Sequence, residues 1–465
     1  MTGAKGWLKN TLPFSALGVT LAVYYLAPSL WLTGMAAALF IFLCWWRLEM
    51  GLSYVILTMP FYFFPKEMDP ALWGIPGVAG RLETLRFSVA EFVVLACLAA
   101  WVLRRLTGVD RGWGAFSGGR KTWLPPLALL GAASLSLLAS QYLWVSLREY
   151  RTVILEPLIF YFLAMVTIKG DRELQLYFDS VLLLGVGMAA ITLYHYFVVG
   201  EVEVVGAAGR ALAIYYSPNQ LGLFLGRLVP LALVLALVGG ASKRWLWVAV
   251  AGGLLLSLYV TYSRGAWLAV ALAMIFSLWF WRRMPLLTWL VVAGGALIFL
   301  PFLPWERLAG GPSLWQRWYI WQAALSIIRD HPIMGIGLDN FLYYYPRYML
   351  EAAWAEPNLS HPHNILLDFW TRLGVWGVGA IIWLQMAFWG TGWRLHSSLK
   401  EGKLQGMVLA LMASMVSFLV HGFIDNSFFI IDLAYFFWLT FALIMGIEAA
   451  AGTGTMAVPQ EDESK

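Results

Sequence analysis

Two histidines close the longest polar stretch of an otherwise apolar chain, in the segment His361-Pro362-His363-Asn364. A neutral imidazole accepts a proton near pH 7, which makes histidine a common general base. Arginines occur at several helix ends before this segment, and nearby guanidinium groups disfavour a charged imidazole. The pattern predicts a site in which His363 takes up a proton beside a bound anion, with His361 as the second candidate for the base.

The arginines of interest are those that membrane topology does not explain. They are Arg148 and Arg151 at the start of one predicted helix, Arg210 before another, Arg264 in a turn and Arg317 on the polar loop. A guanidinium group offers two parallel donors, so it suits a diphosphate better than an ammonium group does. We expect several of these side chains to bind one diphosphate, although any single one of them would equally serve as an anchor for a lipid phosphate.

The composition excludes a soluble protein. Of 465 residues, 61% are hydrophobic and only 12% are charged, whereas a soluble domain carries about a quarter of charged residues. The net charge of +5 comes from short Lys and Arg clusters between apolar runs, which are topology signals and not a nucleic-acid surface. Cys44 and Cys97 both lie inside apolar runs, so neither a disulfide framework nor a cysteine metal site is expected.

The chain contains about fourteen apolar runs near the length of about 20 residues that spans a bilayer. They lie near 12–28, 30–46, 50–64, 87–103, 123–140, 150–168, 175–198, 213–239, 245–262, 265–281, 285–303, 364–392, 404–422 and 427–448. The third contains Pro60 and is a candidate re-entrant segment. This pattern predicts an all-α polytopic membrane protein with about 12–14 transmembrane helices, one large loop and no convincing strands.

Basic clusters alternate along the chain and predict that both termini are cytoplasmic and that the loop 304–363 is extracytoplasmic. We therefore divide the chain into N-terminal helices (1–204), core helices (205–303), the loop (304–363), C-terminal helices (364–450) and a cytoplasmic tail (451–465). Within the loop, 313–328 is predicted to form an amphipathic helix that ends at Gly335-Ile336-Gly337. The residues 341–345 form a second aromatic patch, and together these segments would roof the site.

Five phrases in order between about 205 and 380 carry a family resemblance. They are Ser217-Pro218-Asn219, Ser263-Arg264-Gly265, Arg317-x-x-x-Trp321, Pro332-x-x-Gly335-x-Gly337, and His363-Asn364 followed by Gly374 and Gly377. The ordered set resembles the O-antigen ligase and polymerase superfamily of bacterial membrane glycosyltransferases. Pro362 stands where a smaller residue is commoner, which leaves open which of the two histidines acts.

The resemblance implies a GT-C-like fold in the bacterial inner membrane. It implies an undecaprenyl-diphosphate-linked glycan as donor, a lipid or glycan as acceptor, and an extracytoplasmic active site. In such a site His363 would be the base, and Arg264, Arg317 and Arg210 would bind the diphosphate. The secondary candidates for site residues are His361, Asn364, Asn219, Arg148 and Arg151.

For these residues, the resemblance implies a single inverting displacement at an anomeric carbon. The chain has no Asp-x-Asp motif and no cluster with metal-ligand spacing, so we expect no metal and no cofactor. No glycine-rich phosphate loop follows a strand, which argues against a nucleotide-sugar donor. Arginines would stabilise the leaving diphosphate in place of a metal.

Other functions remain open from the sequence. A polysaccharide polymerase and a protein O-oligosaccharyltransferase share the same motifs as a ligase to lipid A-core. A transporter of lipid-linked glycans is the alternative from a different class, because Glu91, Glu156 and Asp179 lie within apolar runs. Arg227 also lies within an apolar run, which predicts a functional or a paired, buried charge there. No internal repeat supports the transporter.

Overall fold

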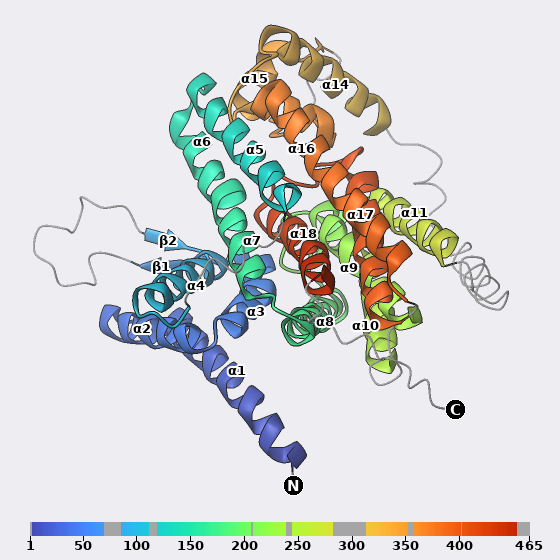
Figure 1. The fold of residues 1–465 in the computed structure, drawn as a ribbon. Coiled ribbons are helices and arrows are strands. Elements are labelled where there is room, and N and C mark those ends of the chain that lie inside the picture. Colours follow the sequence, from blue (N-terminus) through green and yellow to red (C-terminus); the bar gives the residue numbers. More distant parts are fainter. Residues whose placement is uncertain are drawn as a thin grey trace, which may run out of the picture. The chain divides into compact units, whose positions relative to one another are not determined.

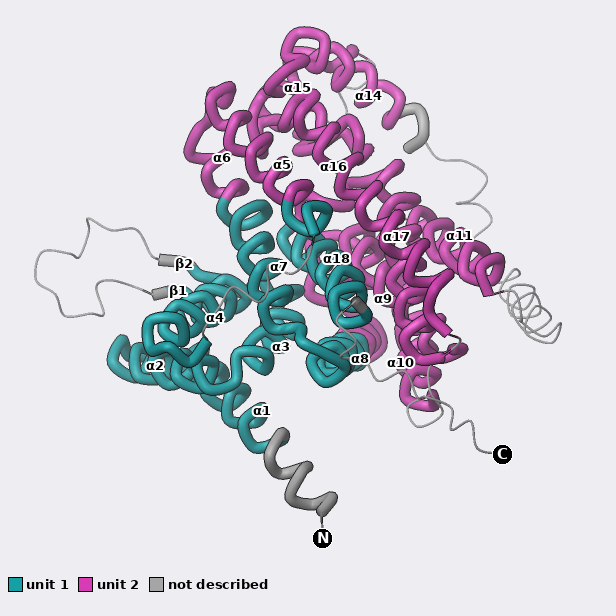
Figure 2. The backbone as a smooth tube through the Cα atoms, viewed as in Figure 1, with its two compact units in different colours: residues 1–123, 151–187, 431–465 teal, residues 124–150, 188–430 magenta. Residues whose placement is uncertain are grey.

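The computed structural model describes residues 2–68, 85–110, 119–205, 208–238, 244–281, 313–351, 358–400 and 402–452. The chain divides into two compact units, shown in different colours in Figure 2. Unit 1 comprises 1–123, 151–187 and 431–465, and unit 2 comprises 124–150 and 188–430. Each unit is therefore assembled from segments that lie far apart in the sequence.

The described residues confirm an all-α polytopic membrane protein (Figure 1). Seven helical stretches are long and apolar enough to cross a membrane, and five shorter apolar helices accompany them. The seven are Arg120–Ala139, Leu143–Thr167, Asp171–Val199, Pro218–Val238, Ile365–Ser398, Lys403–Gly422 and Ile431–Ala451. The predicted run 285–303 lies outside the described residues.

Unit 1 contains the N-terminal helices. They are α1 (Thr2–Leu26), α2 (Leu30–Trp46), α3 (Leu48–Thr58) with a 3-10 turn at Met59–Phe63, α4 (Val89–Leu106), α7 (Glu156–Thr167), most of α8 (Asp171–Tyr194), and α18 (Ile431–Gly452). The helix α2 packs on α1 and α4, while α18 packs on α7. The run 50–64 is thus an α-helix that tightens into a 3-10 turn at Pro60.

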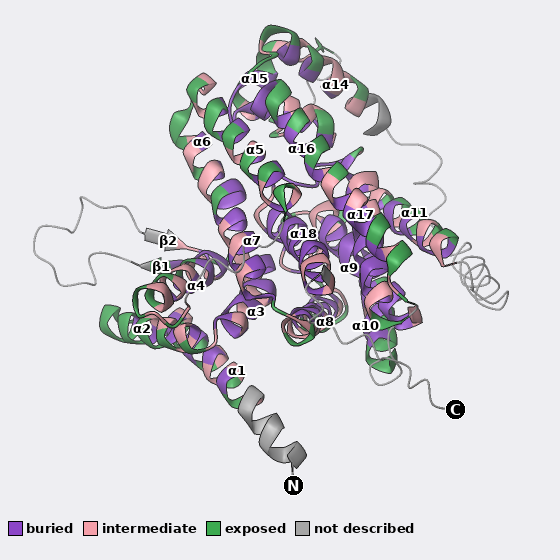
Figure 3. Cartoon of the chain, in the orientation of Figure 1, coloured by how far each residue is buried: buried purple, intermediate pink, exposed green. Residues whose placement is uncertain are grey.

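Unit 2 contains all the predicted site residues except Arg151, which belongs to unit 1. It holds most of α5 (Arg120–Ser136), α6 (Leu143–Glu149), α9 (Pro218–Val238), α10 (Arg244–Val260), α11 (Arg264–Phe280), α14 (Ser313–Asp330), α15 (Phe341–Tyr348), α16 (Ile365–Ser398) and α17 (Lys403–Gly422). The helix α9 packs against α10, α11 and α17, and most of its residues are buried (Figure 3).

Small residues allow this close packing. A Cβ atom added at Gly222 of α9 would lie 2.8 Å from the Cβ of Ser263, at the start of α11. One turn later, Gly226 faces Ser417 of α17, whose hydroxyl donates to the Gly226 carbonyl over 2.5 Å. Inside a bilayer the hydrophobic effect does not drive helices together. Transmembrane helices therefore associate through close backbone contacts, which small residues such as these allow.

Strands make up very little of the described residues, as the sequence predicted. Two short antiparallel pairs form, β1 (Lys66–Met68) with β2 (Leu85–Phe87) and β3 (Val202–Val205) with β4 (Ala208–Ala211). Each strand has only three or four residues, which is too short to show a periodic pattern in the sequence. The second hairpin matters for the site because β4 carries Arg210.

The predicted loop helix is present as α14, but it ends at Asp330 and not at the Gly335-Ile336-Gly337 phrase. The aromatic patch 341–345 belongs to α15, where Phe341 and Tyr345 are fully buried. These rings pack with Ile320, Ala323, Ala324 and Ile327 of α14 into one hydrophobic cluster. The two helices thus form a packed pair, which contacts α16 through α14.

Candidate active site

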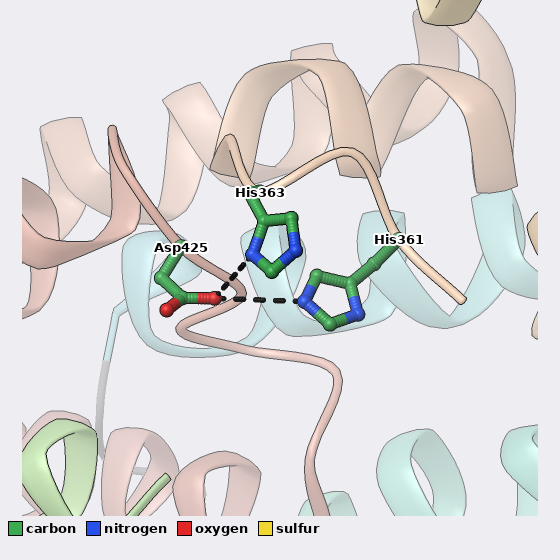
Figure 4. A group of neighbouring side chains, drawn as sticks. All are labelled: His361, His363 and Asp425. Atoms are coloured by element: carbon green, nitrogen blue, oxygen red, sulfur yellow. Dashed lines mark hydrogen bonds and ion pairs between the residues drawn. The ribbon is translucent and has the colours of Figure 1, made fainter. Parts of the chain in front are cut away.

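Two histidines and one carboxylate meet in unit 2 (Figure 4). Nδ1 of His363 lies 2.8 Å from Oδ1 of Asp425, and Nε2 of His361 lies 3.5 Å from the same oxygen. The two imidazole rings have their centroids 4.2 Å apart. The histidines precede α16, whereas Asp425 lies in the segment between α17 and α18, so three-dimensional folding brings them together.

Charge decides the state of the carboxyl group. Burial alone would raise the pKa of Asp425, but His363 and His361 beside it hold that pKa well below its usual value. Asp425 is therefore an acceptor at neutral pH. Burial, together with the neighbouring His363, lowers the pKa of His361, so His361 is neutral near pH 7.

The two histidines are not equivalent. Because Asp425 is ionised, the Nδ1–H of His363 donates to it, and the neutral ring then presents its lone pair on Nε2. The structure gives that Nε2 no protein partner among the described residues, and the side chain is 22% exposed. In His361 both nitrogens face protein groups, Nδ1 towards the Ser360 hydroxyl at 3.0 Å and Nε2 towards Asp425. Only His363 is arranged to accept a proton from a ligand.

The backbone of His363 is strained. Its φ of 51° lies in the left-handed region, which costs a non-glycine residue about 1–3 kcal/mol. The next residue, Asn364, caps α16, since its Oδ1 accepts from the backbone N–H groups of Leu366 at 3.0 Å and Leu367 at 3.2 Å. Its Nδ2 donates to the Phe423 carbonyl at 3.1 Å. Asn364 therefore positions the segment, and its secondary role in the site stays a prediction.

The helix α14 docks directly on the histidine segment. Nε1 of Trp321 donates to the carbonyl of Pro362, between the two histidines, over 3.1 Å. Arg317 lies one helical turn before Trp321, so the Arg-x-x-x-Trp spacing puts both side chains on one helix face. Burial lowers the pKa of Arg317, as does the nearby Arg264, while Asp425 opposes this change. The three charged groups thus lie within electrostatic range of one another.

Arg264 occupies the first position of α11 and is exposed. Arg210 reaches the turn before it, because its Nε donates to the Thr261 carbonyl at 3.0 Å. The same guanidinium group donates to Oδ1 of Asn219 at 2.9 Å. Arg210, predicted to bind the diphosphate, and Asn219, a secondary candidate, are thereby brought together at the base of the turn that presents Arg264.

The two glycine phrases form a backbone clasp. The N–H of Ile336 donates to the Thr371 carbonyl over 2.8 Å, and that of Val375 donates to the Pro332 carbonyl over 3.0 Å. Between them α16 is interrupted at Gly374, whose φ is 67°. Residues 332–337 and 371–375 therefore fit each other main chain to main chain, which explains why glycine is needed at this break.

The remaining arginines have partners of their own. Arg148 pairs with Asp339 at 2.9 Å and is 69% exposed. Arg151 belongs to unit 1, where it pairs with Glu91 at 2.5 Å and Glu156 at 3.1 Å. These carboxylates are two of those that favoured a transporter, and an arginine already offsets them. Neither Arg148 nor Arg151 is placed at the histidine pair by these contacts.

Sequence reasoning missed Asp425 and a buried ionic cluster around Arg372. Nη1 of Arg372 lies 2.5 Å from Glu149 of α6, and its Nε lies 2.7 Å from Asp368. An arginine four residues after an aspartate within an apolar run was an available sequence signal for a buried pair. Asp425 offered less, because it stands in a short polar connection that resembles any other turn.

The donor atoms of His361, His363 and Asp425 all lie within 4.8 Å of one another, a set from which zinc sites are built. Arg317 and Arg264 act on the same region, and their positive charge opposes a divalent cation while it favours an anion. The electrostatics thus favour an anion here, and metal independence stays a prediction.

Residues 248–384 match the model of a family described as O-Antigen ligase. The matched region includes Arg264, Arg317 and both histidines, whereas Arg210 and Asp425 lie outside it. No curated protein matches the chain in a sequence comparison. Together with the helical membrane fold, the family match confirms the resemblance to the O-antigen ligase and polymerase superfamily.

Proposed function

We propose that this protein transfers a glycan from undecaprenyl diphosphate to an acceptor hydroxyl at the extracytoplasmic face of the bacterial inner membrane, with both termini in the cytoplasm. The observation that carries the proposal is the hydrogen bond of 2.8 Å between His363 and Asp425, which leaves Nε2 of the histidine available as a base. Arg317 and Arg264 in the same region supply the positive charge that a diphosphate requires.

The reaction is a single displacement. The acceptor oxygen attacks the anomeric carbon while its proton passes to Nε2 of His363. The bond from that carbon to the phosphate oxygen breaks, and the diphosphate leaves with the electron pair. Asp425 stabilises the imidazolium that forms, and Arg264 and Arg317 stabilise the charge on the leaving group. Attack from the side opposite to the leaving group inverts the anomeric configuration.

The acceptor defines the kind of enzyme. A ligase takes a hydroxyl of lipid A-core or another surface glycan, whereas a polymerase takes the end of a second lipid-linked glycan. An O-oligosaccharyltransferase takes a protein hydroxyl. The family match supports an enzyme of the ligase and polymerase type, and the acceptor distinguishes its members.

The test uses purified protein in detergent with a polyprenyl-diphosphate-linked glycan and each class of acceptor. We expect transfer to lipid A-core without added nucleotide, undiminished by a chelator, with the new glycosidic bond inverted as seen by NMR. Loss of transfer in chelator that magnesium restores would show that the arginines do not carry the leaving group. Transfer only to a second lipid-linked glycan would identify a polymerase.

A further inference from the structure

We propose that Arg372 and Trp321 are positioning residues of the transfer site, which hold the histidine segment so that His363 stays bonded to Asp425. The proposal rests on the proposed role of His363 as the base. Neither side chain needs to touch substrate. Both donate to main-chain carbonyls of the segment 358–364, on alternate residues around the histidines.

Arg372 is the deeper of the two tethers. Its side chain is 2% exposed, and its three nitrogens each have a different acceptor. Nε donates to Asp368 in its own helix at 2.7 Å, Nη1 to Glu149 in α6 at 2.5 Å, and Nη2 to the Ser360 carbonyl at 3.2 Å. A guanidinium fork can satisfy three such directions at once, while an ammonium group cannot reproduce that geometry.

Arg372 also contacts the segment that carries Asp425. Its guanidinium carbon lies 4.7 Å from the centre of the Phe429 ring, in a cation-π arrangement. Phe429 is in turn fixed by Asn426, whose Oδ1 accepts the Phe429 N–H at 2.9 Å. The buried Arg372 therefore contacts both segments of the site. It bonds to the residue before His361 and packs on Phe429, which follows Asp425.

Trp321 is an independent tether from a different helix. Its indole N–H donates to the Pro362 carbonyl, which lies between the two histidines. Proline offers no N–H, so the carbonyl is the one group of Pro362 that can form a hydrogen bond with α14. The same helix carries Arg317, so the contact also sets the distance between the base and the diphosphate ligand.

The strain at His363 explains why tethers are needed. A non-glycine residue keeps a left-handed backbone only when its surroundings hold it there. Here the carbonyls of Ser360 and Pro362 are each held by a donor from outside the segment, and Asn364 bonds to the Phe423 carbonyl. Without these bonds the segment would relax, and the imidazole would turn away from Asp425.

The test measures the single-turnover transfer rate and the donor Kd for Trp321→Phe and Arg372→Lys, each alone and combined with His363→Ala. The phenylalanine keeps a ring but deletes the donor, and the lysine keeps the charge in the buried cluster. We expect each single variant to lose about 10–100-fold in rate, which is what a misplacement of the base near 1 Å costs, with an unchanged donor Kd. In the His363→Ala background the same changes should alter the remaining rate by less than about twofold, because there is no longer a base to position.

Matched controls separate this role from general damage to the fold. Trp389→Phe deletes an indole bond to Gln385 in the same helix as Arg372, and Arg104→Lys removes a fork from Asp110 in unit 1. Both should transfer at the wild-type rate. Thermal unfolding of all variants in detergent identifies any that fail to fold, and Trp321→Phe keeps the test decisive if Arg372→Lys is one of these.

Three results would overturn the proposal. The rate losses could persist undiminished in the His363→Ala background, donor binding could weaken in place of turnover, or Trp321→Phe could transfer like the wild type. If His363→Ala itself transfers at the wild-type rate, the proposed base is wrong and the positioning role is lost with it. That outcome is distinguished from the others by the single variant alone.

Discussion

At the scale of single residues, His361 and His363 differ in their hydrogen bonds. His361 is held on both nitrogens, by Ser360 and Asp425, whereas His363 is held on one. A base needs an accessible lone pair, and an orienting group needs fixed contacts. The sequence His-Pro-His does not distinguish the two histidines, whereas their contacts with Asp425 and Ser360 do.

The base is tested by comparing His363→Ala with His361→Ala. We expect His363→Ala to lower the single-turnover rate by roughly 10²–10⁴-fold with donor binding nearly intact, the usual contribution of a general base. His361→Ala should have a milder effect. Asp425→Asn should also lower the rate, because it no longer selects the tautomer with its lone pair on Nε2. The reverse order of the two histidine variants would move the base to His361.

The arginines fail differently from a base. Arg264→Lys and Arg317→Lys keep the charge but lose the paired donors, so both donor affinity and transfer rate should fall. The measurements are equilibrium binding of the lipid diphosphate and the transfer rate for each variant. Arg244→Lys, whose side chain bonds the Leu237 carbonyl, is the control and should behave like the wild type. Unchanged donor binding in both test variants would place the diphosphate elsewhere.

At the scale of elements, the clasp between 332–337 and 371–375 sets where the first turns of α16 point. The break at Gly374 kinks the helix, and the bonds across the clasp hold the break in place. The histidines precede that first section and Arg372 lies inside it. The glycine phrases contain no reactive side chain. They therefore contribute to the site by fixing the backbone geometry.

The clasp predicts a position-specific cost for a single methyl group. In Gly374→Ala the new Cβ would collide with the Ile333 carbonyl, and the φ of 67° disfavours alanine. We expect a loss of more than about 1 kcal/mol of stability. Gly379→Ala in the same helix is the control, because nothing lies within 4 Å of its added Cβ. Thermal unfolding in detergent compares the two, and an equal melting temperature for both would exclude a tight clasp.

At the scale of the whole molecule, the proposed reaction depends on which side of the membrane the loop lies. Basic clusters at alternate connections predict an extracytoplasmic loop and cytoplasmic termini. In the proposed reaction, a glycan carried on a polyprenyl diphosphate would reach an extracytoplasmic site only after it has crossed the membrane. Orientation is thus a condition for the function.

Reporter fusions check the orientation directly. A fusion near residue 330 should report the extracytoplasmic side, and one near residue 400 should report the cytoplasm. A periplasmically active phosphatase and a cytoplasmically fluorescent protein give opposite readouts at each position. A cytoplasmic result at 330 would contradict the mechanism, whatever the activity of the histidine variants.

The sequence by itself determined the membrane class, the apolar runs, and the local features of the site. Hydropathy predicts the transmembrane spans because, in a bilayer, the backbone N–H and C=O groups of each helix must bond to one another. The histidine pair, the Ser263-Arg264-Gly265 turn and the Arg317-x-x-x-Trp321 spacing are likewise local, so they are visible without any tertiary contact. The helix predicted over 313–328 is present as α14. The two hairpins were missed, because strands of three or four residues carry too little periodicity.

Only the tertiary structure decided which groups meet. Asp425 lies 62 positions from His363, and Glu149 lies 223 positions from Arg372. The packing of the helices determines these partners. No spacing within a single sequence predicts which helices will pack together. The same holds for Arg151. The sequence pattern grouped it with the other arginines, but in the structure it pairs with Glu91 and Glu156 in unit 1. Residue types show what chemistry is possible, while packing determines the partners that distinguish His363, the proposed base, from His361.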